Sequence, residues 1–280
     1  MWKMIRPENA IEQMVVTVRF SESLSSLVSK RIIRELERST SNVGLTNRQA
    51  VQGFQLNMQA AGQNFVPVAM PGMLFQSTSV FRVNEEVVNQ ISQQVEFQPT
   101  HLAYSTWTYK SWDKERETLT KLLLPAIETA VQSITIGAVR LQYLDRFVFD
   151  GDKGAVQARD LLNDETDLIA PNIFTAPDLY HSHTGRFDNV TSRSRRLSQV
   201  NVDSQDMLSD GQPDALAGRR TISLLTAIED QFLESGKEFS SEEVAGFLSS
   251  QLDDLHVHAL TLFKRVINNK FAQEHRLPHE

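Results

Sequence analysis

Two histidines and the acidic residues around them are the side chains best suited to bind a metal ion. His181 and His183 are two residues apart, and this spacing places both on one side of an extended segment. Asp178 and Asp188 lie nearby and could supply the third ligand that zinc requires. A polar loop that binds no metal is the preferred interpretation of this segment, so His181 and His183 are only weak candidates for metal ligands. We therefore assign no metal ligand and expect no cofactor.

A cluster of arginines is the most distinctive local charge feature. The segment RFDNVTSRSRR, Arg186 to Arg196, holds four arginines in a chain whose net charge is −7. Guanidinium groups suit phosphate, carboxylate or an acidic protein surface. The alternative is a solvated loop, or a strand whose charges point outward. The residues expected to contact an anion or a partner are Arg186, Arg193, Arg195 and Arg196, followed in rank by Arg140 and Arg146, which could instead form structural ion pairs.

An acid and a histidine four residues apart form a third candidate. Asp254 and His258 could hydrogen bond on one helix, which would hold the imidazole in one tautomer. We expect His258 on the apolar face of that helix and His256 elsewhere. No serine or cysteine nucleophile accompanies the pair, and a core histidine is the commoner explanation, so no catalytic residue is assigned.

The common catalytic and nucleotide-binding motifs are absent. The sequence contains no G-x-x-x-x-G-K-[ST], G-x-G-x-x-G, H-E-x-x-H or G-x-S-x-G. The absence of Cys excludes disulfide scaffolds, iron–sulfur clusters and cysteine nucleophiles. The net acidity argues against a non-specific coat on nucleic acid, which needs a basic surface. Enzymatic activity is left open, and a non-catalytic role is preferred.

The N-terminal residues and the short apolar runs predict a cytoplasmic protein. The segment MWKMIRPENAIEQ lacks the apolar stretch of a signal peptide. The longest apolar runs, such as Leu122 to Leu124, are far too short to span a bilayer. We therefore expect no transmembrane segment and no lipid anchor.

The elements that must position these residues begin with a strand and a helix. The β-branched segment from Met14 to Phe20 is typical of a strand. Apolar residues then recur at helical spacing, and the helix should end near residues 39–42. Its apolar face consists of Leu24, Leu27, Val28, Ile32 and Leu36.

A β-meander is predicted over residues 49–110. Aromatic and Thr residues in the segment LAYSTWTYKSW favour a long strand. Val88 to Phe97 fits either a strand or a short helix. The strands of the meander are expected at Val51 to Met58, Leu74 to Val83 and Leu102 to Trp112.

The clearest helical stripe follows the meander. Asp113 is a suitable N-cap, the stripe extends to Ile134, and Pro125 inside it should bend the helix. Thr135 to Asp150 then alternates in polarity and predicts a strand. One face of that strand holds Val139, Leu141, Tyr143, Phe147 and Phe149, opposite Arg140, Gln142 and Arg146.

Periodicity weakens over residues 151–215, where we expect long loops, with Ser204 to Asp214 as the best candidate for a mobile segment. Arg220 to Ile228 resumes a strand-like pattern. Ser240 and Glu243 form a capping box that should begin a long helix ending near Phe271.

These elements predict an α+β fold with a mainly antiparallel sheet and long amphipathic helices packed on one face. We expect two sheet-and-helix halves. Residues 1–150 form the N-terminal half, residues 151–215 form a loop-rich connection, and residues 216–280 complete the second half. The alternative is a single helix-grip fold, in which the last helix closes over a curved sheet and an apolar cavity.

One strand carries a pattern of the form I-G-x-x-R-x-x-Y-x-[DN]-R. The matching residues are Ile136, Gly137, Arg140, Tyr143, Asp145 and Arg146. With the opening strand VVTVRF and a closing helix that contains Leu255-His256 and Phe263, the chain resembles a sporadically distributed family of uncharacterised bacterial proteins of about 250–280 residues. The patchy occurrence of that family implies mobile genes such as antiphage-defence modules, and the resemblance carries over no catalytic residue.

Three functions follow as expectations. The first is a non-catalytic intracellular binding or sensor protein of a bacterial antiphage-defence module, acting with a second protein encoded nearby. The second is a carrier or sensor of an apolar or lipid-like ligand in a sheet–helix cavity. The third is a metal-dependent hydrolase or nuclease that uses His181 and His183. An anionic ligand and a homo-oligomer stay open alternatives.

Overall fold

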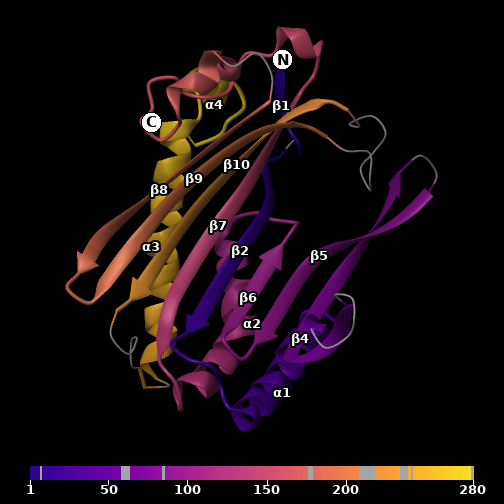
Figure 1. The fold of residues 1–280 in the computed structure, drawn as a ribbon, viewed down its shortest axis with the longest axis vertical. Helices are drawn as coiled ribbons and strands as arrows, with labels where there is room; N and C mark the ends of the chain where they lie inside the picture. Colours follow the sequence, from indigo (N-terminus) through magenta and orange to yellow (C-terminus); the bar gives the residue numbers. More distant parts are fainter. Residues whose placement is uncertain are drawn as a thin grey trace.

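The computed structural model describes residues 1–6, 8–57, 64–83, 86–175, 179–207, 218–233, 239–240 and 242–278. The expected α+β fold is confirmed: the described residues form one ten-stranded, antiparallel sheet and four helices (Figure 1). The strands are β1 (Trp2–Met4), β2 (Ile11–Phe20), β3 (Asn47–Asn57), β4 (Asn64–Val83), β5 (Glu86–Gln98), β6 (His101–Thr106), β7 (Ile136–Phe149), β8 (Tyr180–Thr191), β9 (Ser194–Asp206) and β10 (Arg220–Phe232). The helices are α1 (Ser26–Asn42), α2 (Trp112–Val131), α3 (Glu243–Val266) and α4 (Asn269–Glu274).

The sheet is built around two central strands. Its strand order is β3-β4-β5-β6-β2-β7-β10-β9-β8. The short strand β1 lies outside this order and pairs with the end of β7, beyond the residues of β7 that pair with β2. β2 and β7 pair antiparallel, with Val16 opposite Leu141 and Thr17 opposite Arg140. Strand β7 therefore has neighbours on both sides along its length.

The three longer helices cover one face of the sheet. Figure 1 shows α1, α2 and α3 behind the strands, and α3 packs on β7 and β10 while α2 packs on β6 and between α1 and α3. Met14, Val16 and Val18 of β2 point to this side and are fully buried. We call the opposite side the helix-free face.

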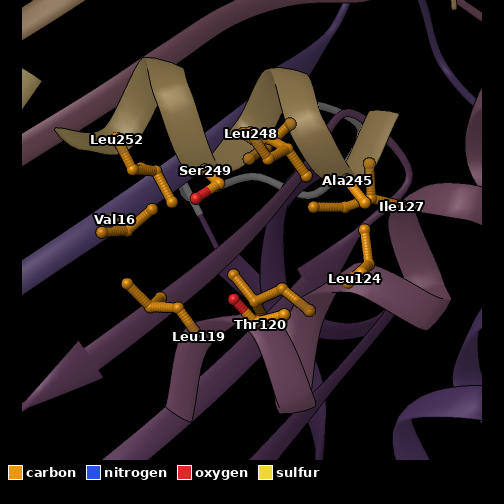
Figure 2. A pocket seen from close by; sticks show the side chains of 11 residues that line it. Val16, Leu119, Thr120, Leu124, Ile127, Ala245, Leu248, Ser249 and Leu252 are labelled. Atoms are coloured by element: carbon orange, nitrogen blue, oxygen red, sulfur yellow. The ribbon is translucent and has the colours of Figure 1, made fainter. Parts of the chain in front are cut away.

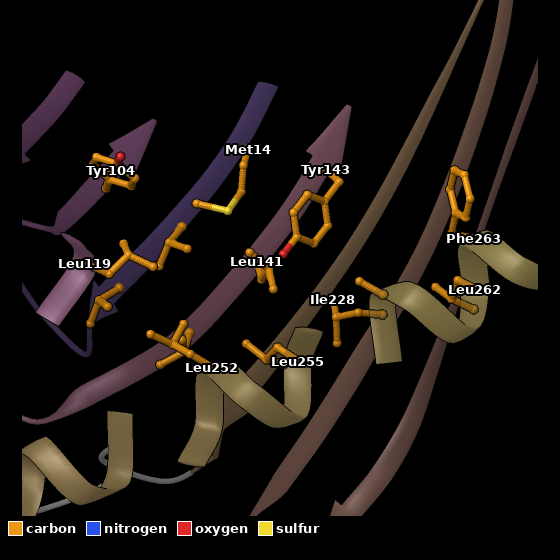
Figure 3. Packing of buried hydrophobic residues seen from close by; sticks show 14 of the residues in the cluster. Met14, Tyr104, Leu119, Leu141, Tyr143, Ile228, Leu252, Leu255, Leu262 and Phe263 are labelled. Atoms are coloured by element: carbon orange, nitrogen blue, oxygen red, sulfur yellow. The ribbon is translucent and has the colours of Figure 1, made fainter. Parts of the chain in front are cut away.

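The core lies between the helices and the central strands. Figure 3 shows Met14, Leu141, Tyr143 and Ile228 extending from the strands toward α3, which contributes Leu252 and Leu255. The alternation predicted for β7 is confirmed, because its residues from Val139 to Phe149 at odd-numbered positions are buried. Burying each large apolar side chain contributes roughly 1.5–3 kcal/mol to folding.

Several elements differ from their predicted bounds. Strand β6 ends at Thr106, well before Trp112, because the Thr106 Oγ1 accepts a hydrogen bond from the Thr108 backbone N–H at 3.2 Å and turns the chain. Helix α2 begins directly at Trp112, with Ser111 rather than Asp113 at the N-cap. Val88 to Phe97, which fitted two patterns, lies in strand β5. In α1, Leu27 faces solvent at 70% exposure, and Ile32 and Leu36 are buried.

The second part of the chain also departs from expectation. Residues 180–206, expected as loop, form the hairpin β8–β9, while three 3-10 turns occupy Lys153–Ala155, Ala158–Asp160 and Pro171–Thr175. Most of the segment expected to be mobile, residues 208–214, lies outside the described residues. The capping box is present, with Ser240 and Glu243 bonded in both directions.

The closing helix is interrupted. Helix α3 stops at Val266, and Asn268 starts α4 by accepting hydrogen bonds from the backbone of Lys270 and Phe271. Among the helices that the structure describes, none has the length and apolar character needed to cross a membrane.

Candidate functional site

A pocket of about 370 Å³ lies between α3 and the sheet, at the end of the molecule where Figure 1 places α4 and both chain ends. Its size falls within the range of small-molecule sites. Five segments line it: the β1–β2 connection, the β6–α2 connection, the central strands, α3 and the residues after α4. We call it the Asp145 pocket; its lining includes Asn9, Ile11, Tyr109, Lys110, Trp112, Tyr143, Asp145, Thr226, His256, Leu260, Phe263, Arg276 and Leu277.

A buried carboxyl group marks the floor of the pocket. Asp145 follows Tyr143 on the helix side of β7, and only 3% of it is exposed. Burial raises the pKa of Asp145 to about 8. Within the part of the chain that the structure describes, its carboxyl group has neither a hydrogen bond nor an ion pair. Asp145 is therefore mainly protonated at pH 7, and it can donate one hydrogen bond to a guest.

A β-bulge next to Asp145 shapes this floor. Ile11 pairs with Asp145 and Gln13 with Leu144, so Glu12 is the extra residue of β2. The Arg146 Nε donates to the Glu12 Oε2 at 2.8 Å on the far side of the strand. Arg146, a second-ranked anion candidate, thus holds the bulge that positions its neighbour Asp145.

Three aromatic side chains form one wall. The Tyr143 hydroxyl lies 2.9 Å from the His256 Nδ1, and the His256 ring stacks on Trp112 with centroids 4.5 Å apart. The Trp112 Nε1 donates to the Asp253 Oδ1 at 2.7 Å, which ties α2 to α3. Burial lowers the pKa of His256 below its usual value, so the imidazole is neutral at pH 7.

The mouth is held by a side-chain bridge between two connections. The Asn9 Oδ1 accepts a hydrogen bond from the Ile11 N–H at 3.0 Å, and the Asn9 Nδ2 donates to the Tyr109 carbonyl at 3.3 Å. The Tyr109 ring packs edge to face on Tyr143, and burial raises the pKa of Tyr109 to about 12. The pocket thus presents phenol, imidazole and carboxylic acid groups among apolar residues such as Ile11, Leu260 and Phe263.

A second cavity beneath the helices is too small to bind a ligand. It lies between α2 and α3, where Leu119 and Thr120 face Leu248 and Leu252 across Val16 (Figure 2). Its volume is about 30 Å³, which is close to that of one water molecule. Compared with this cavity, the Asp145 pocket has both a ligand-sized volume and convergent polar groups.

The arginine candidates are distributed over both faces of the sheet. Arg196 is buried on the helix side, where its Nε and Nη2 each donate to Asp230 at 2.7 Å and its Nη2 also contacts Asp254. Its neighbour Arg195 points to the helix-free face and lies over the Phe187 ring, 4.7 Å from the centroid. Arg193 is exposed in the β8–β9 turn.

The remaining arginines have carboxylate partners. Arg186 pairs with Asp188 at 2.9 Å on exposed β8, and Arg140 lies 3.5 Å from Glu229 on the helix-free face. The structure therefore does not gather the six arginines into one site. Contact with an anion or a partner stays a prediction for the exposed Arg186, Arg193 and Arg195.

The two metal candidates meet a carboxylate that sequence analysis did not select. His181 and His183 of β8 both approach Asp203 of β9, which is directly opposite His181 in the sheet register. Asp178 lies outside the described residues, and Asp188 is occupied by Arg186.

The positions expected for the two histidines of α3 are wrong. His258 is exposed and lies 2.9 Å from the Asp254 carbonyl, whereas His256 lines the pocket. Helical spacing could have placed His256 on the buried face of α3, because it is three residues before the buried Ala259 and seven before the buried Phe263.

Comparison with known proteins adds no relative: no family model, no curated protein and no solved structure matches this chain.

Proposed function

We propose that this chain is a non-catalytic binding or sensor protein that holds a small, mainly apolar molecule in the Asp145 pocket. The observation that carries this proposal is a buried, protonated carboxyl group that faces a ligand-sized apolar cavity without a partner among the described residues. Leaving a buried polar group unpaired costs roughly 1–3 kcal/mol, and a ligand that pairs with it recovers this energy.

The lining favours an uncharged ligand with a hydrogen-bond acceptor. Asp145 as a neutral acid donates a hydrogen bond, so a carbonyl or hydroxyl oxygen is the complementary group. Tyr109, Trp112 and Phe263 supply the apolar and aromatic surface for the body of the ligand. At the rim, the exposed side chains of Glu8, Lys110 and Arg276 include both charge signs, so they do not alter the preference for an uncharged ligand.

Binding is favoured over catalysis because several polar groups of the pocket already have partners. Tyr143 bonds to His256, and Asn9 bridges two backbone groups. Asp145 has no partner among the described residues and keeps its hydrogen-bonding capacity, and a neutral acid can orient a ligand without activating a nucleophile.

The first experiment tests occupancy. Native mass spectrometry of gently purified protein should show a bound small molecule, and the anionic dye anilinonaphthalene sulfonate should fluoresce in the emptied pocket. Leu260→Trp should reduce the dye signal severalfold, because the larger side chain fills the cavity. Val257→Trp on the exposed side of the same helix, at 58% exposure, is the matched control. Equal dye signals from both variants would contradict the proposal.

We also propose that the chain consists of two sheet-and-helix halves. The strand order supports this division, because β2 and β7 lie side by side at the centre and each begins a unit. The first unit continues through α1, β3 to β6 and α2, and the second through β8 to β10 and α3. In both units the last strand, β6 or β10, returns next to the first. This division places the boundary between α2 and β7, before residue 136, whereas the sequence predicted a first half of residues 1–150 that includes β7.

The wider role stays a prediction from the resemblance. The resemblance makes the chain a component of an antiphage-defence module that acts with a partner protein. A pull-down from infected and uninfected cells tests it, because an adapter or sensor should capture the same partner reproducibly, and capture of no partner in either state would count against it.

A further inference from the structure

Three side chains on the outer strands converge on one point of the helix-free face. His181 and His183 project from the same side of β8, and Asp203 lies on the neighbouring β9. The His181 Nδ1 and the His183 Nε2 lie 2.7 and 2.9 Å from the same carboxylate oxygen, Oδ1 of Asp203. The three potential ligand atoms all lie within 4.8 Å of one another.

The donor set suits a borderline divalent cation. Two imidazole nitrogens and one carboxylate oxygen form a set that zinc uses in three-ligand sites, with bonds of about 2.0–2.2 Å. Tetrahedral bonds of that length place neighbouring ligand atoms about 3.3 Å apart. The observed 2.7 and 2.9 Å separations are close to this value, so a small rotation of the side chains would admit the ion.

The surroundings allow that rotation and leave the ion open to solvent. The side chains of His181 and His183 are 76% and 56% exposed, whereas Asp203 is 30% exposed and anchored on β9. The strands fix the three Cα positions, because His181 pairs with Asp203 and His183 with Asn201 in the ladder. The ladder therefore fixes the backbone of the site, and the exposed imidazoles have room to turn toward an ion.

We propose that His181, His183 and Asp203 bind one Zn²⁺ ion on the helix-free face, with the remaining coordination position open to water or to a ligand atom of another molecule. This site is separate from the Asp145 pocket, which lies on the helix side of the sheet. The proposed zinc site does not depend on the function proposed for the Asp145 pocket.

Metal titration tests the site directly. Protein purified without a polyhistidine tag and treated with EDTA should bind one Zn²⁺ per chain by calorimetry. Co²⁺ should give visible absorption bands between about 500 and 700 nm in the same ratio, as expected for a four-coordinate N/O site. His183→Ala and Asp203→Asn should each weaken binding at least tenfold.

The control is His258→Ala, which removes an exposed histidine of α3 and should leave metal binding unchanged. His181→Ala provides a second ligand variant at a strongly exposed position, where folding is insensitive to the change. Circular dichroism verifies that each variant is folded. Absence of saturable binding by the unmodified chain, or equal losses in His183→Ala and His258→Ala, would overturn the proposal.

Discussion

Asp145 and Arg196 are both ionisable groups buried in the sheet, and they adapt to burial in opposite ways. Asp145 has no charged partner among the described residues and retains its proton. Arg196 retains its charge and donates to two carboxylates, those of Asp230 and Asp254. An uncompensated buried charge is far more costly than either solution. The protonated Asp145 can therefore donate a hydrogen bond to a ligand, whereas the donors of Arg196 are used in ion pairs that stabilise the fold.

Asp145→Asn should change how stability depends on pH. In the unfolded chain this carboxyl group ionises above about pH 4, but in the folded protein it keeps its proton up to about pH 8. Raising the pH through this window therefore favours unfolding of the parent protein, by roughly 1.4 kcal/mol per pH unit at most. Asparagine cannot ionise, so the variant should gain stability relative to the parent between pH 4 and pH 8, with no further gain above.

Urea denaturation at four pH values across this window measures the effect. Asp164→Asn makes the same substitution at an exposed position and should follow the parent curve. Parallel curves for Asp145→Asn and the parent would show that Asp145 ionises normally.

Two adjacent arginines should differ strongly in their contribution to stability. Arg196→Ala leaves the buried Asp230 without its cationic partner, with only the Gln251 Nε2 still donating to it among the described residues, and should cost about 3–5 kcal/mol. Arg195→Ala removes an exposed side chain that packs on Phe187 and should cost less than about 1 kcal/mol. Urea midpoints at pH 7 compare the two, and equal losses would contradict the assignment of Arg196 to the core.

At the scale of elements, the central strands and helices were predictable, whereas the outer hairpin was not. Strand β7 alternates because one of its faces is buried beneath α3. Most residues of β8 are exposed on both faces, so no hydrophobic period marks the strand. The break between α3 and α4 depends on Ile267, which forms a bridge with distant Leu162. A local sequence pattern cannot reveal a contact between residues so far apart in the chain.

The Asp145 pocket was predictable only in part for the same reason. An apolar cavity beneath the last helix was one of the expected alternatives, and Tyr143 and Asp145 belong to the pattern that carries the family resemblance. Asn9, Tyr109 and Arg276 come from connections whose paths depend on the assembled fold. No periodicity in the sequence brings these connections together.

The turn that follows α4 gives a prediction for this element. Arg276 has a φ of 56°, a left-handed conformation that glycine adopts at lower cost than other residues. Arg276→Gly should stabilise the protein by about 0.5–1 kcal/mol, because it relieves this strain. Gln273→Gly, inside the same helix and exposed, should destabilise by a similar amount. Thermal unfolding of the two variants should therefore shift in opposite directions, and shifts of the same sign would contradict this explanation.

At the scale of the whole molecule, the division into two halves can be tested by cutting the chain. A cut between the exposed Gln132 and Ser133 separates α2 from β7 without opening a strand. The fragments 1–132 and 133–280 should assemble when coexpressed, since each contains complete strands and helices. A cut between Leu141 and Gln142, inside β7, should prevent assembly.

Copurification through a tag on one fragment, followed by circular dichroism, measures the outcome. The proposal of two halves fails if both cuts give the same yield of complex, or if neither gives any.

The position of β7 has a consequence for the order of folding. This strand pairs with β1, β2 and β10, so it joins the earliest strands of the chain to the last one. Pairings between segments so distant in sequence form slowly, because a long loop must close before the contacts stabilise it. Until β7 is in place, the inner edge of β2 and that of β10 are both exposed and able to pair with other chains. Refolding should therefore be most vulnerable to aggregation before β7 docks, and the strand that contributes Asp145 to the pocket is also the one that closes the sheet.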